Sequence, residues 1–295
     1  MFGGIYTPIV TPFKEDESID FEKLKYNLDI WGKTDLDGIV VLGSNGEFVY
    51  LSHEEKLEVV KFVIDNFNEE KNIIVGTYCE STIETIKLTK EMAKLGADAA
   101  LVLPPNYYRG GMNEEILYDH FVDVADESSI PVMIYNMPGN TGINLSSKLI
   151  ARLSKHPNIV GIKDTAGNIV QLSETVRDTD EDFAVFAGNA GYLLPAFTVG
   201  ARGATLALAN ILPDDCCKLV NLFKEGKIDE ARKLQLKMIE INYLVTGGMG
   251  ISGLKYALDL LGFQGGVVRR PLKPLTEEKK SIIKDALVKY GALQE

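Results

Sequence analysis

The sequence is poor in the residues that build metal centres and disulfide frameworks. Its 295 residues include three cysteines, three histidines and one tryptophan. Cys79 stands alone and Cys216 adjoins Cys217, so none has the spacing of a zinc site or of a disulfide framework. No segment approaches the roughly 18 consecutive apolar residues of a membrane span. These absences exclude a disulfide-rich secreted domain and a membrane protein, and they fit a reduced cytosol best.

Positive charge is also scarce. The chain has 31 basic against 42 acidic residues, a net charge of -11 and an isoelectric point near 4.9. The acidic residues are spread along the chain, and such a surface repels phosphate backbones, so nucleic acid is not an expected partner. The amino-terminal segment lacks a basic stretch followed by an apolar one, so no signal peptide is indicated. We therefore expect a cytoplasmic protein.

Short β-branched runs alternate with helical stretches as far as about residue 225. This is the pattern of βα units that build a parallel sheet. The predicted strands cover residues 5–10, 38–42, 73–77, 99–103, 132–135, 159–163, 183–187 and 203–206. Eight such units predict an α/β fold, the (β/α)8 TIM barrel. The alternative, a doubly wound open sheet, would favour a glycine-rich turn after the first strand, where this chain has Thr7-Pro8-Ile9.

More helical segments follow the eighth predicted strand than one barrel needs. They lie around residues 215–225, 229–245, 252–261 and 276–290. The sequence therefore predicts a barrel with the active site over residues 1–225 and a C-terminal helical bundle over residues 226–295.

Polar side chains follow six of the predicted strands at their carboxyl ends, where a barrel places its active site. They are Ser44, Asn45, Tyr107, Tyr135, Lys163, Thr165, Gly188, Asn189 and Thr205. Paired glycines around Ser44-Asn45 predict a tight turn into a helix, whose backbone N–H groups could bind an anion. The histidines, at positions 53, 120 and 156, fall away from these ends. Because no His, Asp and Glu cluster is expected there, a metal-dependent enzyme is disfavoured and a Schiff-base enzyme is favoured.

Lys163 is the residue on which this chemistry depends. It closes a buried strand, and burial disfavours the ammonium form. The neutral amine can add to a ketone, and loss of water then gives an iminium that accepts electrons. Alternation along the strand points Lys163 and Gly161 into the barrel, and we expect Gly161 to leave space beneath the lysine stem. Tyr135, on the adjacent strand, could shuttle the protons.

Three motifs, Gly43-Ser44-Asn45-Gly46-Glu47, Tyr135-Asn136-Met137-Pro138 and Gly161-Ile162-Lys163-Asp164, carry a resemblance to a known family. In order and spacing the chain resembles, over essentially its whole length, the pyruvate-dependent class I aldolases. That family includes dihydrodipicolinate synthase and N-acetylneuraminate lyase. The resemblance implies a barrel with a C-terminal helical bundle, and usually a homotetramer built as a dimer of dimers.

The resemblance also implies roles for individual residues. Lys163 would form the Schiff base with pyruvate, so no other cofactor is expected, and Tyr135 would transfer protons. Ser44 and Asn45 would hold the pyruvate carboxylate, and Tyr107 would reach across the dimer into the neighbouring site. The aldehyde half of the pocket would be lined by Thr165, Gly188 and Asn189, with Thr205 as a further substrate-binding residue.

Departures from the family's motifs favour some members over others. The synthase usually has Thr-Thr in the turn, and an arginine for the carboxylate of its second substrate stands where this chain has Asn140. The lyase usually has Ser-Thr in the turn. The Ser-Asn turn, the run Cys79-Glu80-Ser81-Thr82 and Asn140-Thr141-Gly142 more closely resemble 4-hydroxy-2-oxoglutarate aldolase of the animal mitochondrial type. The chain begins at its first strand without an Arg- and Ser-rich leader, so we expect a cytoplasmic relative.

The leading hypothesis is therefore a Schiff-base aldolase that forms or cleaves a 4-hydroxy-2-oxo acid, with pyruvate and an aldehyde or oxo acid as the small-molecule partners. The first choice is 4-hydroxy-2-oxoglutarate, which yields pyruvate and glyoxylate. The alternatives are a 2-keto-3-deoxy sugar acid aldolase, dihydrodipicolinate synthase, N-acetylneuraminate lyase, and a dehydratase or deaminase that starts from the same iminium. A non-catalytic keto-acid binding protein is disfavoured, because nothing in the catalytic set is missing.

Overall fold

The computed structural model describes residues 2–294, and at its centre eight parallel strands close into a barrel. The strands are β1 (Gly4–Pro8), β2 (Gly38–Val41), β3 (Asn72–Gly76), β4 (Ala99–Val102), β5 (Val132–Asn136), β6 (Ile159–Asp164), β7 (Ala184–Ala187) and β8 (Gly203–Thr205). Each pairs with the next in chain order, and β8 pairs with β1, where Gly4 faces Gly203 and Tyr6 faces Thr205. The predicted TIM barrel is confirmed, with strand ends within two residues of those expected.

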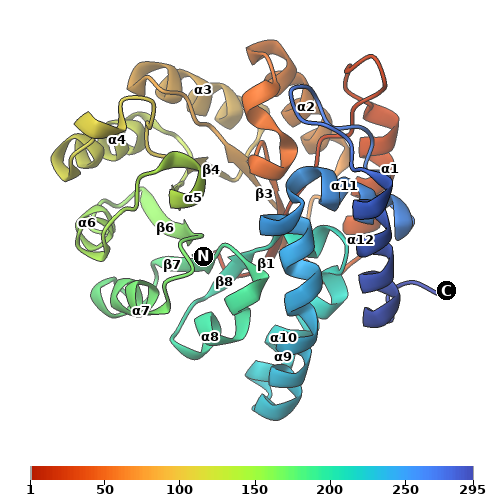
Figure 1. The fold of residues 1–295 in the computed structure, drawn as a ribbon. Helices are drawn as coiled ribbons and strands as arrows, with labels where there is room; N and C mark the ends of the chain where they lie inside the picture. The colour runs from red at the N-terminus through yellow and green to blue at the C-terminus, as the bar shows by residue number, and fades with distance from the viewer. Residues whose placement is uncertain (1, 295) are drawn as a thin grey trace.

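Helices surround the strands in chain order (Figure 1). They are α1 (Phe21–Trp31), α2 (His53–Asn66), α3 (Thr82–Leu95), α4 (Glu114–Glu127), α5 (Pro138–Thr141), α6 (Ser147–Leu153), α7 (Ile169–Asp178), α8 (Leu193–Thr198) and α9 (Pro213–Lys224). Ser52 caps α2 in a capping box with Glu55, and Ser146 caps α6 by accepting from Leu149 N. Because all eight strands pair in parallel, their carboxyl ends face one side of the molecule.

Three further helices follow the barrel, and they pack on one another at one side of it (Figure 1). They are α10 (Ile228–Tyr243), α11 (Gly250–Leu260) and α12 (Glu277–Tyr290). Residues Leu244–Gly248 form a single π-helical turn, η6, between α10 and α11. The helix α10 also contacts α8 and α9, so the bundle lies directly on the barrel wall. The division after residue 225 stays a prediction.

Gly161 is needed for a strand contact that the sequence did not indicate. A Cβ atom at Gly161 would lie 2.4 Å from the carbonyl oxygen of Ala184 on β7, so a side chain there would collide with the neighbouring strand. Gly161, Ile162 and Lys163 pair in unbroken register with Met133, Ile134 and Tyr135, and the space expected beneath the lysine stays a prediction. The glycine is required for the close approach of β6 to β7.

Burial of His120 in α4 predicts that the protein loses stability in acid. The ring is 3% exposed and its Nδ1 lies 2.9 Å from Thr82 Oγ1. Burial lowers the pKa of His120 from 6.5 to about 4, against the opposing charge of Glu80. The unfolded chain therefore binds a proton between pH 6.5 and 4 that the folded chain does not, and about 3 kcal/mol of stability is lost across this range.

We expect His120→Gln to flatten the fall in unfolding free energy between pH 7 and 4.5, measured by urea denaturation. The matched control is His156→Gln, because His156 is less buried than His120 and its ring pairs with the exposed carboxylate of Asp126. An unchanged slope in His120→Gln would contradict the assignment.

Candidate active site

A cavity of about 510 Å³ lies at the carboxyl ends of the strands, and it brings together most of the residues singled out in the sequence. Its predicted members are Ser44, Asn45, Tyr135, Lys163, Thr165, Gly188, Asn189 and Thr205, and Asn140 also lines it. Tyr107 is the exception: its side chain is 77% exposed and does not line this cavity. The strand ends thus converge as the barrel topology requires.

Lys163 and Tyr135 are neighbours on paired strands at the floor of the cavity. They face each other in the register of β5 and β6, and Lys163 Nζ lies 4.2 Å from the centroid of the Tyr135 ring. The Tyr135 hydroxyl is 3.4 Å from Ser44 Oγ, which comes from the end of β2. Lys163 is 3% exposed and Tyr135 4% exposed. An amine, a phenol and an alcohol therefore stand in line in a largely water-excluded site.

The backbone that carries Lys163 is held by buried hydrogen bonds. The Asp164 carboxylate accepts from Ala166 N at 2.7 Å and from Asn136 Nδ2 at 3.3 Å. Burial raises the pKa of Asp164, while these hydrogen bonds oppose the rise. The carbonyl oxygen of Asp164 accepts from the Tyr192 hydroxyl at 2.6 Å, and burial raises the pKa of that phenol. Tyr192 therefore stays a donor that fixes the carboxyl end of β6, next to the lysine.

The Ser44-Asn45 turn differs in detail from the predicted turn into a helix. It forms a short 3-10 turn, η1 (Ser44–Gly46), followed by a second one, η2 (Phe48–Tyr50), and the helix α2 begins only at His53. Between the two turns Glu47 adopts a left-handed backbone with φ 54°. The short turns arise because the left-handed residue interrupts the helical path. The turn therefore offers an anion its local backbone N–H groups and the side chains of Ser44 and Asn45. It does not offer the N-terminus of a long helix.

Thr165, Gly188 and Asn189 form the wall beyond Lys163. Thr165 Oγ1 donates to Asn136 O at 2.7 Å, and a Cβ atom on Gly188 would lie 2.1 Å from Thr165 Cγ2. The Asn189 side-chain oxygen accepts from Asn242 Nδ2 at 2.8 Å. This wall is therefore rigid and tied to α10.

Thr205 contributes a buried hydroxyl with an unused hydrogen-bonding capacity. Its side chain is 1% exposed and lines the cavity, and Oγ1 has no hydrogen-bond partner among residues 2–294. Buried hydroxyls are normally paired, and an orphaned one needs a reason. A ligand in the cavity would supply the partner.

The roof of the cavity comes from residues that sequence reasoning missed. They are Val245, Thr246, Gly247, Met249, Gly250, Ile251 and Ser252, in η6 and the start of α11, together with Leu272. The cavity is thus built from both sides of the division predicted after residue 225. A signal was present, since three glycines at 247, 248 and 250 interrupt an otherwise helical pattern, and π-helical turns often occur at functional sites.

Charge in the cavity is confined to one residue. Lys163 is the only charged side chain among the described residues that line it. An adjoining cavity of about 280 Å³ shares Ser44, Met137 and Asn140 with the first and adds Glu47. Over residues 2–294 no group of three or more His, Cys, Asp and Glu side chains is placed to hold a metal ion. The site can attack a carbonyl, move protons and donate neutral hydrogen bonds.

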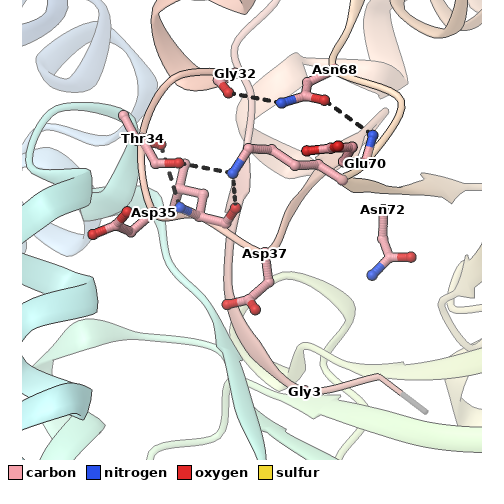
Figure 2. A pocket seen from close by; sticks show the side chains of 10 residues that line it. Gly3, Gly32, Thr34, Asp35, Asp37, Asn68, Glu70 and Asn72 are labelled. Atoms are coloured by element: carbon pink, nitrogen blue, oxygen red, sulfur yellow. Dashed lines mark hydrogen bonds between the residues drawn. The ribbon is translucent and has the colours of Figure 1, made fainter.

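A second large cavity, of about 570 Å³, lies at the opposite end of the barrel (Figure 2). It surrounds the amino ends of β1, β2 and β3, and its polar groups are engaged with the backbone. Lys71 Nζ donates to the carbonyls of Thr34 and Leu36. Asn68 Nδ2 donates to Gly32 O (Figure 2). Because active sites of this fold form at the other face, the cavity around Lys163 is the candidate active site.

Comparison with known proteins agrees with this geometry. Residues 1–290 match the dihydrodipicolinate synthetase family. The chain belongs to this family. It is therefore a lyase, a pyruvate-dependent class I aldolase, as the motifs at Ser44, Tyr135 and Lys163 imply. Over the described residues, no helix is both long enough and apolar enough to span a bilayer.

Individual members of the family differ in the reaction their names state. The chain is 37% identical over 297 residues to a 4-hydroxy-tetrahydrodipicolinate synthase of Methanothrix thermoacetophila, covering 99% of this chain and 98% of that protein. It is 38% identical over 288 residues to a probable mitochondrial 4-hydroxy-2-oxoglutarate aldolase of Emericella nidulans, covering 96% and 93%. The crystal structure of a dihydrodipicolinate synthase of Bacillus anthracis superposes with a TM-score of 0.94 at 32% identity, covering 98% of each chain.

We expect Thr205→Val to weaken ligand binding without destabilising the protein. Valine has nearly the same shape, and removal of an unpaired buried hydroxyl costs the fold little. We expect the pyruvate concentration for half-maximal borohydride trapping to rise about tenfold. The control is Thr7→Val on β1, because the Thr7 hydroxyl already has a protein acceptor, Leu206 O at 3.5 Å. Lower stability with unchanged pyruvate binding in Thr205→Val would show a structural role.

Proposed function

We propose that this aldolase forms and cleaves a 4-hydroxy-2-oxo acid, and that its substrate is 4-hydroxy-2-oxoglutarate, which yields pyruvate and glyoxylate. The observation that carries the proposal is Lys163 Nζ 4.2 Å from the Tyr135 ring centroid, an amine beside a phenol as Schiff-base cleavage needs. The 38% identity to a probable 4-hydroxy-2-oxoglutarate aldolase supports this choice.

In the proposed mechanism, the neutral amine of Lys163 adds to the C2 carbonyl, and loss of water leaves an iminium. Tyr135 removes the proton of the C4 hydroxyl, the C3–C4 bond breaks, and its electron pair passes into the iminium to give an enamine. The aldehyde leaves, C3 takes a proton, and water releases pyruvate from the lysine. The Ser44-Asn45 turn holds the pyruvate carboxylate, and Ser44 Oγ, 3.4 Å from the Tyr135 hydroxyl, relays protons. Each role needs only protein side chains and no added cofactor.

Asn140 argues against the synthase reaction, although relatives such as the Methanothrix thermoacetophila protein carry the name of that synthase. It is exposed at the lip of the cavity, where the second substrate must enter. The synthase's second substrate, aspartate semialdehyde, carries a carboxylate, and an arginine can hold it by two charge-assisted hydrogen bonds. An asparagine offers one neutral donor group, so it is a poor replacement.

A second candidate, cleavage of a 2-keto-3-deoxy sugar acid, is favoured by the uncharged pocket. Apart from Lys163, the described cavity lining offers amides and hydroxyls, among them Asn189 and Thr246. Such groups suit a polyhydroxylated neutral aldehyde, whereas glyoxylate brings a second carboxylate. A dehydratase or deaminase outcome would begin with the same iminium.

We also propose a cytoplasmic homotetramer built as a dimer of dimers, with no nucleic-acid partner. Support for the assembly comes from the neighbouring aromatic rings of Tyr107 and Tyr108, which are 77% and 76% exposed at the end of β4. Two adjacent exposed tyrosines suit a contact with another protomer.

Borohydride reduction tests the Schiff base. With pyruvate present, we expect a stable adduct on Lys163 that peptide mass spectrometry locates, and Lys163→Ala to lose both adduct and aldolase activity. Lys61→Ala is the control, since Lys61 has a 64% exposed side chain on α2. An adduct on another lysine, or none, would refute the mechanism.

A substrate panel tests the choice of aldehyde. We expect wild-type kcat/KM for 4-hydroxy-2-oxoglutarate to exceed the value for synthase turnover of aspartate semialdehyde by at least about 100-fold. Asn140→Arg should raise the synthase rate, because it restores a cation for the second carboxylate. If the wild-type enzyme turned over aspartate semialdehyde as fast as 4-hydroxy-2-oxoglutarate, Asn140 would not decide the substrate. Faster turnover of 2-keto-3-deoxy sugar acids would establish the second candidate.

A further inference from the structure

Directly behind the Ser44-Asn45 turn lies a buried ion pair that the proposed chemistry does not use. Glu47 is 1% exposed and Lys255, on α11, is 2% exposed, and Lys255 Nζ lies 2.6 Å from Glu47 Oε1. Burial lowers the pKa of Lys255 to about 8, even though the Glu47 carboxylate opposes the shift. A buried ion pair is a poor means of stabilising a fold, because desolvation offsets most of the attraction. The position of the pair behind the Ser44-Asn45 turn indicates a role in the site instead.

Glu47 belongs to the turn itself. Its amide N–H donates to Ser44 O at 3.1 Å, and its left-handed backbone ends η1. Its second carboxylate oxygen, Oε2, accepts from Arg269 N at 2.9 Å. Lys255 and Arg269 both come from the C-terminal part of the chain, so the turn is held by residues more than two hundred positions away.

Lys255 reaches the turn by a second route. Its ammonium donates to Thr11 O at 2.8 Å and to Val267 O at 2.7 Å. Thr11 in turn donates from Oγ1 to Gly46 O at 2.8 Å. An ammonium has three N–H groups, so besides these two carbonyls it can also donate to Glu47 Oε1 at 2.6 Å. Lys255 therefore contacts Glu47 directly and Gly46 through Thr11.

The same helix supplies the roof of the cavity. Gly250, Ile251 and Ser252 line the cavity at the start of α11. Ile251 and Lys255 are four residues apart and so lie on one face of the helix. Lys255 itself does not line either of the two adjoining cavities. It can act on a ligand only through the groups that it holds.

We propose that the Glu47–Lys255 pair is a positioning device that sets the distance between the Ser44-Asn45 turn and the α11 roof, so that the turn is preorganised for the carboxylate of pyruvate. The inference rests on the proposed function only in placing that carboxylate at the turn. Neither residue touches the reacting atoms, so both are positioning residues.

The experiment measures pyruvate binding and catalysis separately in Lys255→Met, Glu47→Gln and the double variant. We expect each single variant to raise the pyruvate concentration for half-maximal borohydride trapping at least tenfold, with the rate at saturation changed less than threefold. The double variant leaves no buried charge unpaired, so its stability should recover relative to the singles while its pyruvate binding stays weak. If a single variant fails to fold, pyruvate binding can still be measured in the double variant.

The stability control is Tyr290→Phe, which removes the hydrogen bond from Tyr290 on α12 to Asp215 on α9. We expect it to lower the unfolding midpoint without changing pyruvate binding. Wild-type binding in the double variant, or weakened binding in Tyr290→Phe to the same degree, would overturn the positioning role. Failure of wild-type protein to trap pyruvate at Lys163 would instead refute the proposed function, so the two failures are distinguishable.

Discussion

Closure of the barrel between β1 and β8 is the constraint on which the site depends. Gly4 and Tyr6 pair with Gly203 and Thr205, and through this contact the first and last strands become neighbours. Without closure, Thr205 and Ser44 would belong to distant parts of an open sheet. With it, one residue from each of several strand ends reaches the same small volume, and chemistry is assembled from side chains that are far apart in sequence.

The sequence was enough to predict the barrel and the floor of the cavity, for physical reasons visible in particular residues. Buried parallel strands are short apolar runs, and the carboxyl end of each run coincides with the first polar side chain, as at Lys163 and Ser44. Once eight strands are recognised, their ends must meet. The positions of Lys163 and Asn189 follow from topology and need no knowledge of side-chain packing.

Contacts between distant segments were not predictable in the same way. Residues 245–247 and 249–252 line the cavity because α10 and α11 fold back over the strand ends, and no local pattern states where a helix will dock. The Glu47–Lys255 pair is equally hidden, since a lysine in a helical stretch is normally on the surface. The close approach of β6 to β7 at Gly161 was not predictable either, because it depends on how two separate strands pair. Tyr107 is 77% exposed and does not line the cavity of its own chain, so its predicted role depends on a second protomer.

The π-helical turn at Leu244–Gly248 limits which mutations this sequence can accept during evolution. A π turn holds one more residue than an α turn, and each residue of a helix advances about 100° around its axis. Deletion of a single residue there would rotate the chain that follows by about that angle. Ile251 would turn from the cavity and Lys255 from Glu47 in one step. Substitutions can be accepted one at a time in this segment, whereas a change in its length alters the roof and the carboxylate turn together.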